Sequence, residues 1–172
     1  MPNYRRAYAP GGCWFFTVVT AHRRPILTSN TAIDVLRESV RDVLRTRPFR
    51  IDAWVILPDH MHAIWTLPDA DFSRRWGCIK AAFTRRCGLP RVSAHGSPAG
   101  IWQPRFWEHL IRDEQDFARH MDYVHYNPVK HGHARRVADW PWSSFHRCAR
   151  RGIYRADWGQ AEPVMPSIDV GE

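Results

Sequence analysis

Two histidines separated by one residue, His60 and His62, are the side chains in this sequence with the clearest capacity for chemistry. They follow a Pro58-Asp59 turn signal and lie in an otherwise apolar stretch, 60–65. Because side chains at positions i and i+2 of a strand point to the same face, the two imidazoles are expected to lie side by side. Two neutral imidazoles can provide two ligands to one divalent metal ion. The pair is weak evidence by itself, since ten histidines in 172 residues make a chance His-x-His pair common.

A second pair, His131 and His133, illustrates that risk. It flanks Gly132 in an arginine-rich segment, where nothing in the sequence fixes both rings on one face. We therefore do not expect this second pair to bind metal.

Tyr123 and Asn127 are the next candidates, because residues four apart lie on one face of a helix. A carboxamide oxygen is a hard ligand suited to Mg²⁺ or Mn²⁺, and a neighbouring phenol can act as an oxygen nucleophile. A structural alternative exists for both residues. Tyr123 can pack in the core with its hydroxyl satisfied, and Asn127 can end the helix before Pro128.

Hydrophobic spacing and turn residues predict the elements that would position these side chains. Strands are expected at 14–20, 49–57, 61–67 and 106–112, with the middle two joined as a hairpin by the Pro58-Asp59 turn. Helices are expected from Thr31, as a candidate cap, to before Pro48, at 72–86, and from 113 to about 127. This order predicts an α+β fold, in which an antiparallel sheet has helices packed on one side in a ferredoxin-like βαββαβ arrangement.

The composition favours a nucleic-acid partner. The formal net charge is +8, and a basic balance of this size is typical of proteins that neutralise phosphates. Nine tryptophans, eight phenylalanines and five tyrosines add flat side chains that can stack on unpaired bases, although most of them must form the core. A basic solvated surface without a nucleic-acid partner is the alternative interpretation.

The four cysteines are scattered without a C-x-x-C pair, which predicts free thiols in a reducing compartment. No apolar stretch approaches the roughly 20 residues of a membrane span, and the first ten residues lack the features of a secretory signal. We therefore expect a cytoplasmic protein with no membrane partner.

Six motifs, in this order and spacing, give the chain a specific resemblance over residues 4–146. They are Arg5-Arg6, Gly11-Gly12-x-x-Phe15-Phe16-Thr17, Pro58-Asp59-His60-Met61-His62, Phe106-Trp107-Glu108, Tyr123-x-x-x-Asn127-Pro128-Val129-Lys130 and Trp142-Ser143-Ser144. The chain resembles the REP-associated tyrosine transposases, a branch of the single-tyrosine HUH transposases. The resemblance implies an HUH nuclease core with His60, His62 and Asn127 as metal ligands and Tyr123 as the catalytic tyrosine.

The resemblance also implies the reaction. One divalent metal, Mg²⁺ or Mn²⁺, would polarise the scissile phosphate of single-stranded DNA beside a hairpin, and Tyr123 would form a 5′-phosphotyrosine link that leaves a free 3′-hydroxyl. The link retains the phosphodiester energy, which agrees with the lack of a nucleotide-binding G-x-x-x-x-G-K-[ST] loop. A free phenol titrates near pH 10, so Tyr123 needs activation, for which the metal or His120 is a candidate. The expected DNA contacts are Arg5, Arg6, Arg105, Lys130, Arg135 and Arg136, and the expected assembly is a monomer or a homodimer.

Two features depart from the pattern expected of the wider group. Insertion-sequence relatives generally carry Gln at the position of Asn127, so Asn127 favours the REP-associated branch. Asp59 replaces the more usual Asn, and it can either orient a histidine or only form the turn. The alternatives to a transposase are a non-catalytic binder of nucleic-acid hairpins and a phosphoesterase that activates water.

The sequence divides into residues 1–154, which we expect to form the transposase domain, and an acidic, proline-containing C-terminal tail at 155–172. Its charge is opposite to that of a basic DNA groove. We therefore consider a tail that folds back over the groove and restrains activity, with a disordered end as the alternative.

Overall fold

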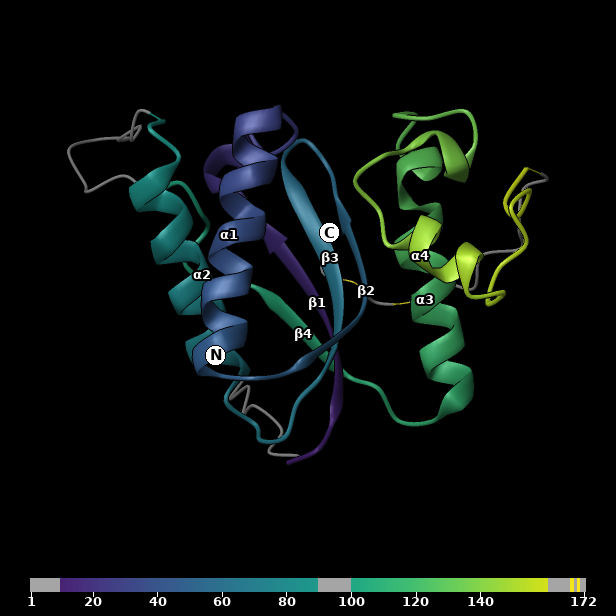
Figure 1. Ribbon diagram of the computed structural model, residues 1–172, viewed down its shortest axis with the longest axis horizontal. Helices are drawn as coiled ribbons and strands as arrows, with labels where there is room; N and C mark the ends of the chain where they lie inside the picture. The colour runs from purple at the N-terminus through teal and green to yellow at the C-terminus, as the bar shows by residue number, and fades with distance from the viewer. Residues whose placement is uncertain (1–9, 90–99, 161–167, 169, 171–172) are drawn as a thin grey trace.

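The computed structural model describes residues 10–89, 100–160, 168 and 170 (Figure 1). Its strands are β1 (Cys13–Val19), β2 (Arg50–Ile56), β3 (His60–Thr66) and β4 (Trp107–Leu110). Its α-helices are α1 (Asn30–Thr46), α2 (Phe72–Arg86), α3 (Glu114–Lys130) and α4 (Phe145–Arg150), with short 3₁₀ turns η1 (Ala21–Arg23) and η2 (Val137–Asp139). All seven predicted elements are present, and each predicted segment overlaps its observed counterpart.

The sheet has the order β2-β3-β1-β4, and every neighbouring pair is antiparallel. The predicted hairpin is confirmed, because the N–H of Leu57 donates to the carbonyl of His60 at 2.9 Å. This order, with β1 and β3 in the middle, is the ferredoxin-like arrangement expected from the sequence. The α+β class is therefore confirmed.

The alternating side chains of β1 build two cores, one on each face of the sheet. Trp14, Phe16 and Val18 pack in the cluster that includes the apolar faces of α1 and α2. Phe15 points to the opposite face, where it packs with residues of α3. Figure 1 shows α1 and α2 on one side of the sheet and α3 and α4 on the other. The expectation of helices on one side thus holds for α1 and α2, whereas the apolar residues of α3 cover the second face.

Two details at helix ends differ from the expectations. The N-cap of α1 is Ser29, whose hydroxyl accepts from the N–H of Ala32 at 3.2 Å, rather than Thr31. Helix α3 does not end at Asn127 but continues through Pro128 to Lys130. Proline removes its own N–H from the helix and crowds the carbonyl four residues earlier, but the final turn is still closed by the N–H of His131, which donates to the carbonyl of Asn127 at 3.0 Å.

The segment 141–144 protects the outer edge of β2. The N–H of Ile56 donates to the carbonyl of Trp142, and the N–H of Ser144 donates to the carbonyl of Trp54. The Ser144 hydroxyl accepts from the N–H of Trp54 at 2.9 Å and lies 2.8 Å from Nε2 of His125 on α3. The Trp142-Ser143-Ser144 motif therefore has a structural role, because it ties α3 to the sheet edge.

The four cysteines, Cys13, Cys78, Cys87 and Cys148, are all free thiols, as predicted. Among the helices in the described ranges, none combines the length and the apolar character needed to cross a membrane.

Candidate active site

His60 and His62 lie at the start of β3, on the face of the sheet that α3 covers. Their positions are fixed by β1, because Val19 is paired with His60 and Thr17 with His62. The two imidazole centroids are 5.0 Å apart, and both side chains are almost completely buried. The predicted neighbouring arrangement of the two rings is therefore confirmed, and burial limits the ways in which the rings can rotate.

Hydrogen bonds to Nδ1 orient both rings. Asp59 Oδ1 lies 2.6 Å from Nδ1 of His60, so Asp59 both shapes the turn and orients a histidine. The Thr17 hydroxyl lies 3.0 Å from Nδ1 of His62, and it donates its proton to the carbonyl of Val170 at 2.6 Å. Because a hydroxyl has only one proton to donate, Nδ1–H of His62 must be the donor to Thr17. In each neutral ring Nε2 then carries the lone pair, which is the state a metal ligand requires.

The charge of Asp59 is itself stabilised. Partial burial alone would raise the pKa of Asp59, but the hydrogen bonds from His60 and Arg23 outweigh it and lower the pKa below its ordinary value. Arg23 Nη1 is 3.2 Å from Asp59 Oδ2. Arg23 and its neighbour His22 adopt positive φ angles, 50° and 56°, a conformation that is uncommon for residues other than glycine. This turn therefore carries backbone strain beside the carboxylate that orients His60.

Tyr123 on α3 lies next to the histidine pair. Its ring centroid is 5.2 Å from that of His62 and 6.1 Å from that of Phe15, in edge-on contacts. Nζ of Lys130 donates to the Tyr123 hydroxyl at 3.0 Å and lies 4.7 Å from the centroid of the ring. Lys130, which the sequence analysis assigns to DNA, is thus in contact with the oxygen of the candidate nucleophile.

Asn127 lies one helical turn beyond Tyr123 and is fully buried. The continuation of α3 past Pro128 places Asn127 inside the last turn rather than at the end of the helix, so its carboxamide is held by regular helix geometry. Two imidazole nitrogens and one carboxamide oxygen suit Mg²⁺ or Mn²⁺ less than an all-oxygen set does, but they leave several positions for phosphate oxygens and water. This donor chemistry fits a catalytic metal.

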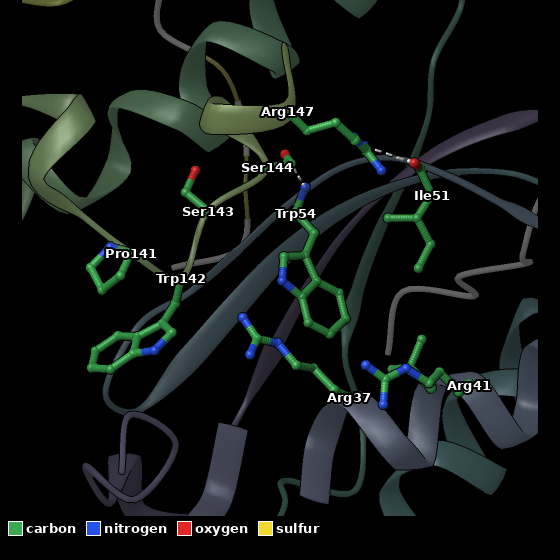
Figure 2. Close-up of a pocket in the computed structure, with 10 residues that line it drawn as sticks. Arg37, Arg41, Ile51, Trp54, Pro141, Trp142, Ser143, Ser144 and Arg147 are labelled. Carbon is green, nitrogen blue, oxygen red and sulfur yellow. Dashed lines mark hydrogen bonds between the residues drawn. The ribbon is translucent and has the colours of Figure 1, made fainter. Parts of the chain in front are cut away.

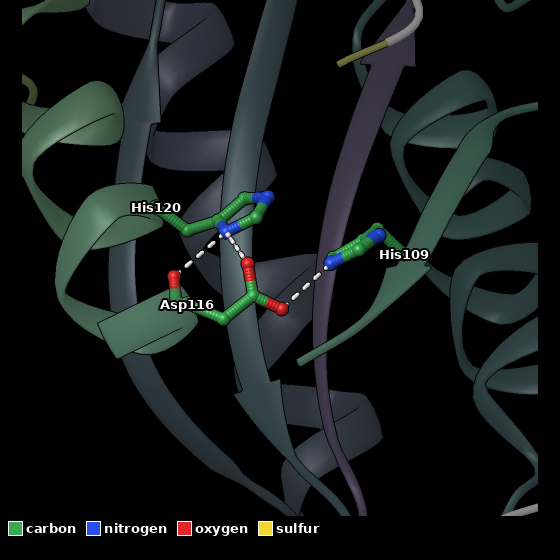
Figure 3. Close-up of side chains that lie close together, drawn as sticks. All are labelled: His109, Asp116 and His120. Carbon is green, nitrogen blue, oxygen red and sulfur yellow. Dashed lines mark hydrogen bonds and ion pairs between the residues drawn. The ribbon is translucent and has the colours of Figure 1, made fainter. Parts of the chain in front are cut away.

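His109, Asp116 and His120 form a group that was not predicted from the sequence, and their ligand atoms all lie within 4.8 Å of one another (Figure 3). Such a group has the residue types that can hold a metal ion. Asp116 Oδ2 lies 2.9 Å from Nε2 of His109, and Nδ1 of His120 donates to the carbonyl of Asp116 at 2.8 Å. The two rings are stacked, with 17° between their planes, so their nitrogen lone pairs do not converge on one point. The group instead resembles a clamp that joins β4 to α3.

The other predicted DNA contacts are distributed around this site. Arg105 is exposed two residues before β4, and Arg135 and Arg136 are exposed after α3. Arg136 also forms a two-point ion pair with Asp139, at 2.7 and 3.1 Å. Arg5 and Arg6 lie outside the described residues. The second histidine pair is exposed, and the ring of His131 is 5.4 Å from that of His60.

Part of the acidic tail reaches the site. Val170, whose carbonyl accepts from Thr17, is buried and belongs to the same apolar cluster as Tyr123 and Phe15. Only 5% of the Tyr123 surface is exposed in this arrangement. The sequence offered opposite charge as a reason for the tail to approach the domain, whereas the observed contacts are apolar packing and a backbone hydrogen bond.

Comparison with known proteins identifies the family of the chain. No family model matches. The chain is 52% identical over 160 residues to the REP-associated tyrosine transposase of Escherichia coli strain K12, which covers 92% of this chain and 91% of that protein. It is 43% identical over 168 residues to a Haemophilus influenzae protein named for the same family, covering 92% of this chain and 94% of that one. A solved structure of a REP-associated tyrosine transposase bound to a REP hairpin superimposes with a TM-score of 0.82, at 47% identity and 99% coverage of both chains. The chain therefore belongs to the REP-associated tyrosine transposases.

Proposed function

We propose that this chain cleaves and rejoins single-stranded DNA next to REP-type hairpins, with Tyr123 as the nucleophile and Mg²⁺ or Mn²⁺ as cofactor. Its family supports a transposase, and the hairpin bound to a 47% identical relative supports hairpin DNA as the partner. The observation that carries the catalytic part is the 5.2 Å between the rings of Tyr123 and His62. This contact brings the nucleophile from α3 to the candidate metal ligands of β3.

In this proposal His60, His62 and Asn127 hold the metal. The Asp59 carboxylate and the Thr17 hydroxyl keep Nδ1 of each imidazole engaged, so that Nε2 is presented as the ligand atom. When bound, the metal supplies positive charge against the scissile phosphate and helps to align it.

Tyr123 then provides the attacking oxygen. The phenolic oxygen loses its proton and forms a bond to phosphorus, the bond from phosphorus to the 3′ oxygen breaks, and that oxygen gains a proton as it leaves. The Lys130 ammonium, 3.0 Å from the phenolic oxygen, stabilises the negative charge that develops there. In the rejoining step the 3′-hydroxyl attacks the phosphotyrosine, and the same ammonium stabilises the departing phenolate. The charge distribution at this site therefore changes little between the forward and reverse reactions.

Basic residues around the site would hold the DNA. Arg105, Arg135 and Arg136 are exposed, and we propose them as phosphate contacts together with Arg5, Arg6 and Lys130. Phosphate contacts of this kind position a nucleic acid without reading its sequence. The assembly that acts on DNA would be a monomer or a homodimer.

The test is to incubate the protein with end-labelled REP-type hairpin DNA that carries single-stranded flanks, in the presence of Mn²⁺, and to separate the products on denaturing gels. The expected result is a covalent protein–DNA adduct with the wild-type chain and none with Tyr123→Phe. Tyr126→Phe is the matched control, because Tyr126 is buried on the same helix and packs against Trp158 rather than against the histidines. It should form the adduct normally.

The alternatives give different patterns in the same gels. Cleavage that persists in Tyr123→Phe would assign the reaction to an activated water molecule. Tight binding without cleavage by the wild-type chain, over a range of metals, would assign the chain to non-catalytic hairpin binding.

A further inference from the structure

A pocket with a volume of about 280 Å³ lies at the protected edge of β2, and it contains none of the candidate catalytic residues. Helix α1, strand β2, the segment 141–144 and helix α4 form its walls (Figure 2). Its lining residues are Arg37, Val40, Arg41, Ile51, Trp54, Pro141, Trp142, Ser143, Ser144 and Arg147. The size is near the lower end of the range for small-molecule sites, roughly 300–1,000 Å³, so the pocket fits one nucleotide and excludes a duplex.

The charge of the pocket favours an anion. Three arginines line it and no carboxylate does. Arg147 donates to the backbone carbonyls of Ile51 and Asp52, at 3.0 and 2.7 Å, which fix its position but leave its charge uncompensated. Nη1 of Arg37 lies 4.0 Å from Oδ1 of Asp34, and both side chains are exposed. Arg41 has no hydrogen bond or ion pair within the described ranges. Guanidinium groups in such a setting are suited to bind phosphate.

Two half-buried indoles, Trp54 and Trp142, give the pocket flat apolar surfaces. Figure 2 shows both indoles projecting toward α1 from neighbouring segments, with the side chain of Arg37 rising from α1 toward the space between them. Aromatic and guanidinium planes are the surfaces on which unstacked bases bind in single-stranded nucleic acids. A pocket that combines both kinds of group can accept a base together with its phosphate.

A row of rings connects this pocket to the candidate active site. The ring centroids are 5.4 Å apart from His60 to His131, 6.2 Å from His131 to His133, 5.6 Å from His133 to Trp140, and 5.1 Å from Trp140 to Trp142. Each step is within the roughly 4.5–7 Å at which aromatic rings contact one another. The two histidines in the middle of the row are exposed, so a strand can lie along them.

We propose that the Trp54–Trp142 pocket binds one unstacked nucleotide of the single-stranded DNA that continues from the cleavage site. The base stacks on Trp54 or Trp142, the phosphate contacts Arg37 and Arg41, and the intervening strand follows the row of rings from His60. This inference rests on the proposed function, because it takes the substrate to be single-stranded DNA beside a hairpin. It adds a second anchor that sets where along the strand the scissile phosphate is placed.

The experiment compares two hairpin DNAs with the same stem, one with single-stranded flanks and one without, by fluorescence anisotropy. We expect Trp54→Leu and Arg41→Gln each to weaken binding of the flanked DNA, by about tenfold for Trp54→Leu, and to leave binding of the bare hairpin unchanged. Arg45→Gln is the matched control, because Arg45 lies one turn further along α1, outside the pocket, and pairs with Asp42. Arg41 is exposed, so Arg41→Gln carries the test even if Trp54→Leu proves unstable.

A second measurement locates the bound nucleotide. A 2-aminopurine base is placed in turn at each flank position of an otherwise identical DNA. Fluorescence quenching at one position that disappears in Trp54→Leu supports the proposal. Equal losses with both DNAs, the same loss in Arg45→Gln, no loss in either pocket variant, or tighter binding of an RNA flank than of a DNA flank would overturn it.

The two proposals can fail separately. If the wild-type chain forms no adduct but prefers the flanked hairpin, and the pocket variants lose that preference, the catalytic proposal fails while the pocket proposal stands. If the adduct forms and the pocket variants bind both DNAs like the wild-type chain, the reverse holds.

Discussion

The orientation of the two site histidines depends on partners from different parts of the chain. Asp59 is the immediate neighbour of His60 and comes from the β2–β3 turn, whereas Thr17 comes from β1 and lies 45 residues before His62. Both partners engage Nδ1, and both therefore favour the tautomer whose Nε2 can bind metal. Partners of this kind commonly change metal affinity as strongly as some ligands do.

Asp59→Ala should therefore weaken Mn²⁺ binding by about 10- to 100-fold, because the His60 ring loses the acceptor that fixes its orientation. Isothermal titration of the full-length protein with Mn²⁺ measures this change. Asp59→Asn keeps an acceptor oxygen and should bind with intermediate affinity.

His109→Ala provides the comparison for that titration. Its imidazole belongs to the clamp with Asp116 and not to the His60–His62 pair, so Mn²⁺ binding should be unchanged. A loss of Mn²⁺ binding in His109→Ala would instead indicate that the clamp holds a metal ion.

The sequence did not reveal the contact between Lys130 and the hydroxyl of Tyr123, the candidate nucleophile. Replacing Lys130 with Met should slow adduct formation by about tenfold to a hundredfold at saturating DNA, because a charge-assisted hydrogen bond to the attacking oxygen is lost. Single-turnover rates measure the chemical step, and anisotropy measures hairpin affinity. Lys130→Arg keeps the charge and should recover most of the rate. A variant that loses affinity while keeping its rate would show that Lys130 serves only DNA binding.

At the scale of secondary structure, apolar patterns in the sequence predicted the strands and helices whose burial produces those patterns. The apolar run at 61–67 identified β3, because a strand buried on both faces is apolar almost throughout. The helical spacing in 72–86 identified α2, because burial of one helix face imposes that period. The position of α3 on the second face could not be read in this way, since its apolar residues specify a buried face but not which surface buries it. The predicted end of α3 at about Asn127 was wrong, because Pro128 lies inside the helix. The general rule ends a helix there, and the closing bond from His131 to Asn127 becomes visible only in the fold.

Only part of the site was predicted from the sequence, because several of its contacts join segments that no local pattern relates. The shared face of His60 and His62 follows from strand geometry alone. The convergence of Tyr123 with His62 depended on the family resemblance, because no local rule brings α3 to β3. The clamp around Asp116 was missed, although the i,i+4 spacing of Asp116 and His120 gave a partial signal. Its third member, His109, comes from β4 and has no local signal.

The Asp116 clamp gives stability a specific dependence on pH. Burial alone would raise the pKa of Asp116, but the hydrogen bonds from His109 and the Arg112 backbone, with the charges of the two histidines, lower it to about 2. A depressed carboxyl pKa stabilises the fold fully above the ordinary value of 3.8, and this contribution is lost as the pH falls toward 2. The contribution is about 2 kcal/mol at neutral pH.

Asp116→Asn should therefore lower the free energy of unfolding at pH 7 by about that amount, and the deficit should shrink at pH 3. Urea denaturation at both pH values measures it. Asp157→Asn is the control, since Asp157 is exposed and forms a surface ion pair with Arg155, and it should be nearly neutral. A deficit in Asp116→Asn that is constant with pH would rule out the carboxylate as its cause.

At the scale of the whole molecule, Val170 of the C-terminal tail shares a buried apolar cluster with the candidate nucleophile, Tyr123. Val170 packs with Tyr123 and Phe15, and its carbonyl bonds to the hydroxyl that orients His62. Ending the chain after residue 160 should increase the rate of adduct formation and DNA affinity at low salt, because it uncovers Tyr123 and removes acidic residues. This truncation retains Trp158, which packs against Tyr126 and Phe145.

Adduct gels and anisotropy at several salt concentrations measure both effects. Val170→Asp in the full-length chain separates them, because it disrupts the apolar packing while adding negative charge. It should increase the rate without increasing affinity. A truncated chain with unchanged rate and affinity would show that the segment does not restrain the enzyme.

The central place of β1 in the sheet has a consequence for how the protein is made. This strand, rich in aromatic and β-branched residues, leaves the ribosome early, but its two neighbours are β3 and, much later in the chain, β4. At roughly 5–20 residues per second, Trp107 follows Thr17 after an interval on the order of ten seconds, although the two pair in the finished sheet. During that interval β1, an apolar strand, is made but β4, one of its two neighbours in the sheet, is not. A chaperone that shields nascent β-edges should therefore favour a good yield over inclusion bodies.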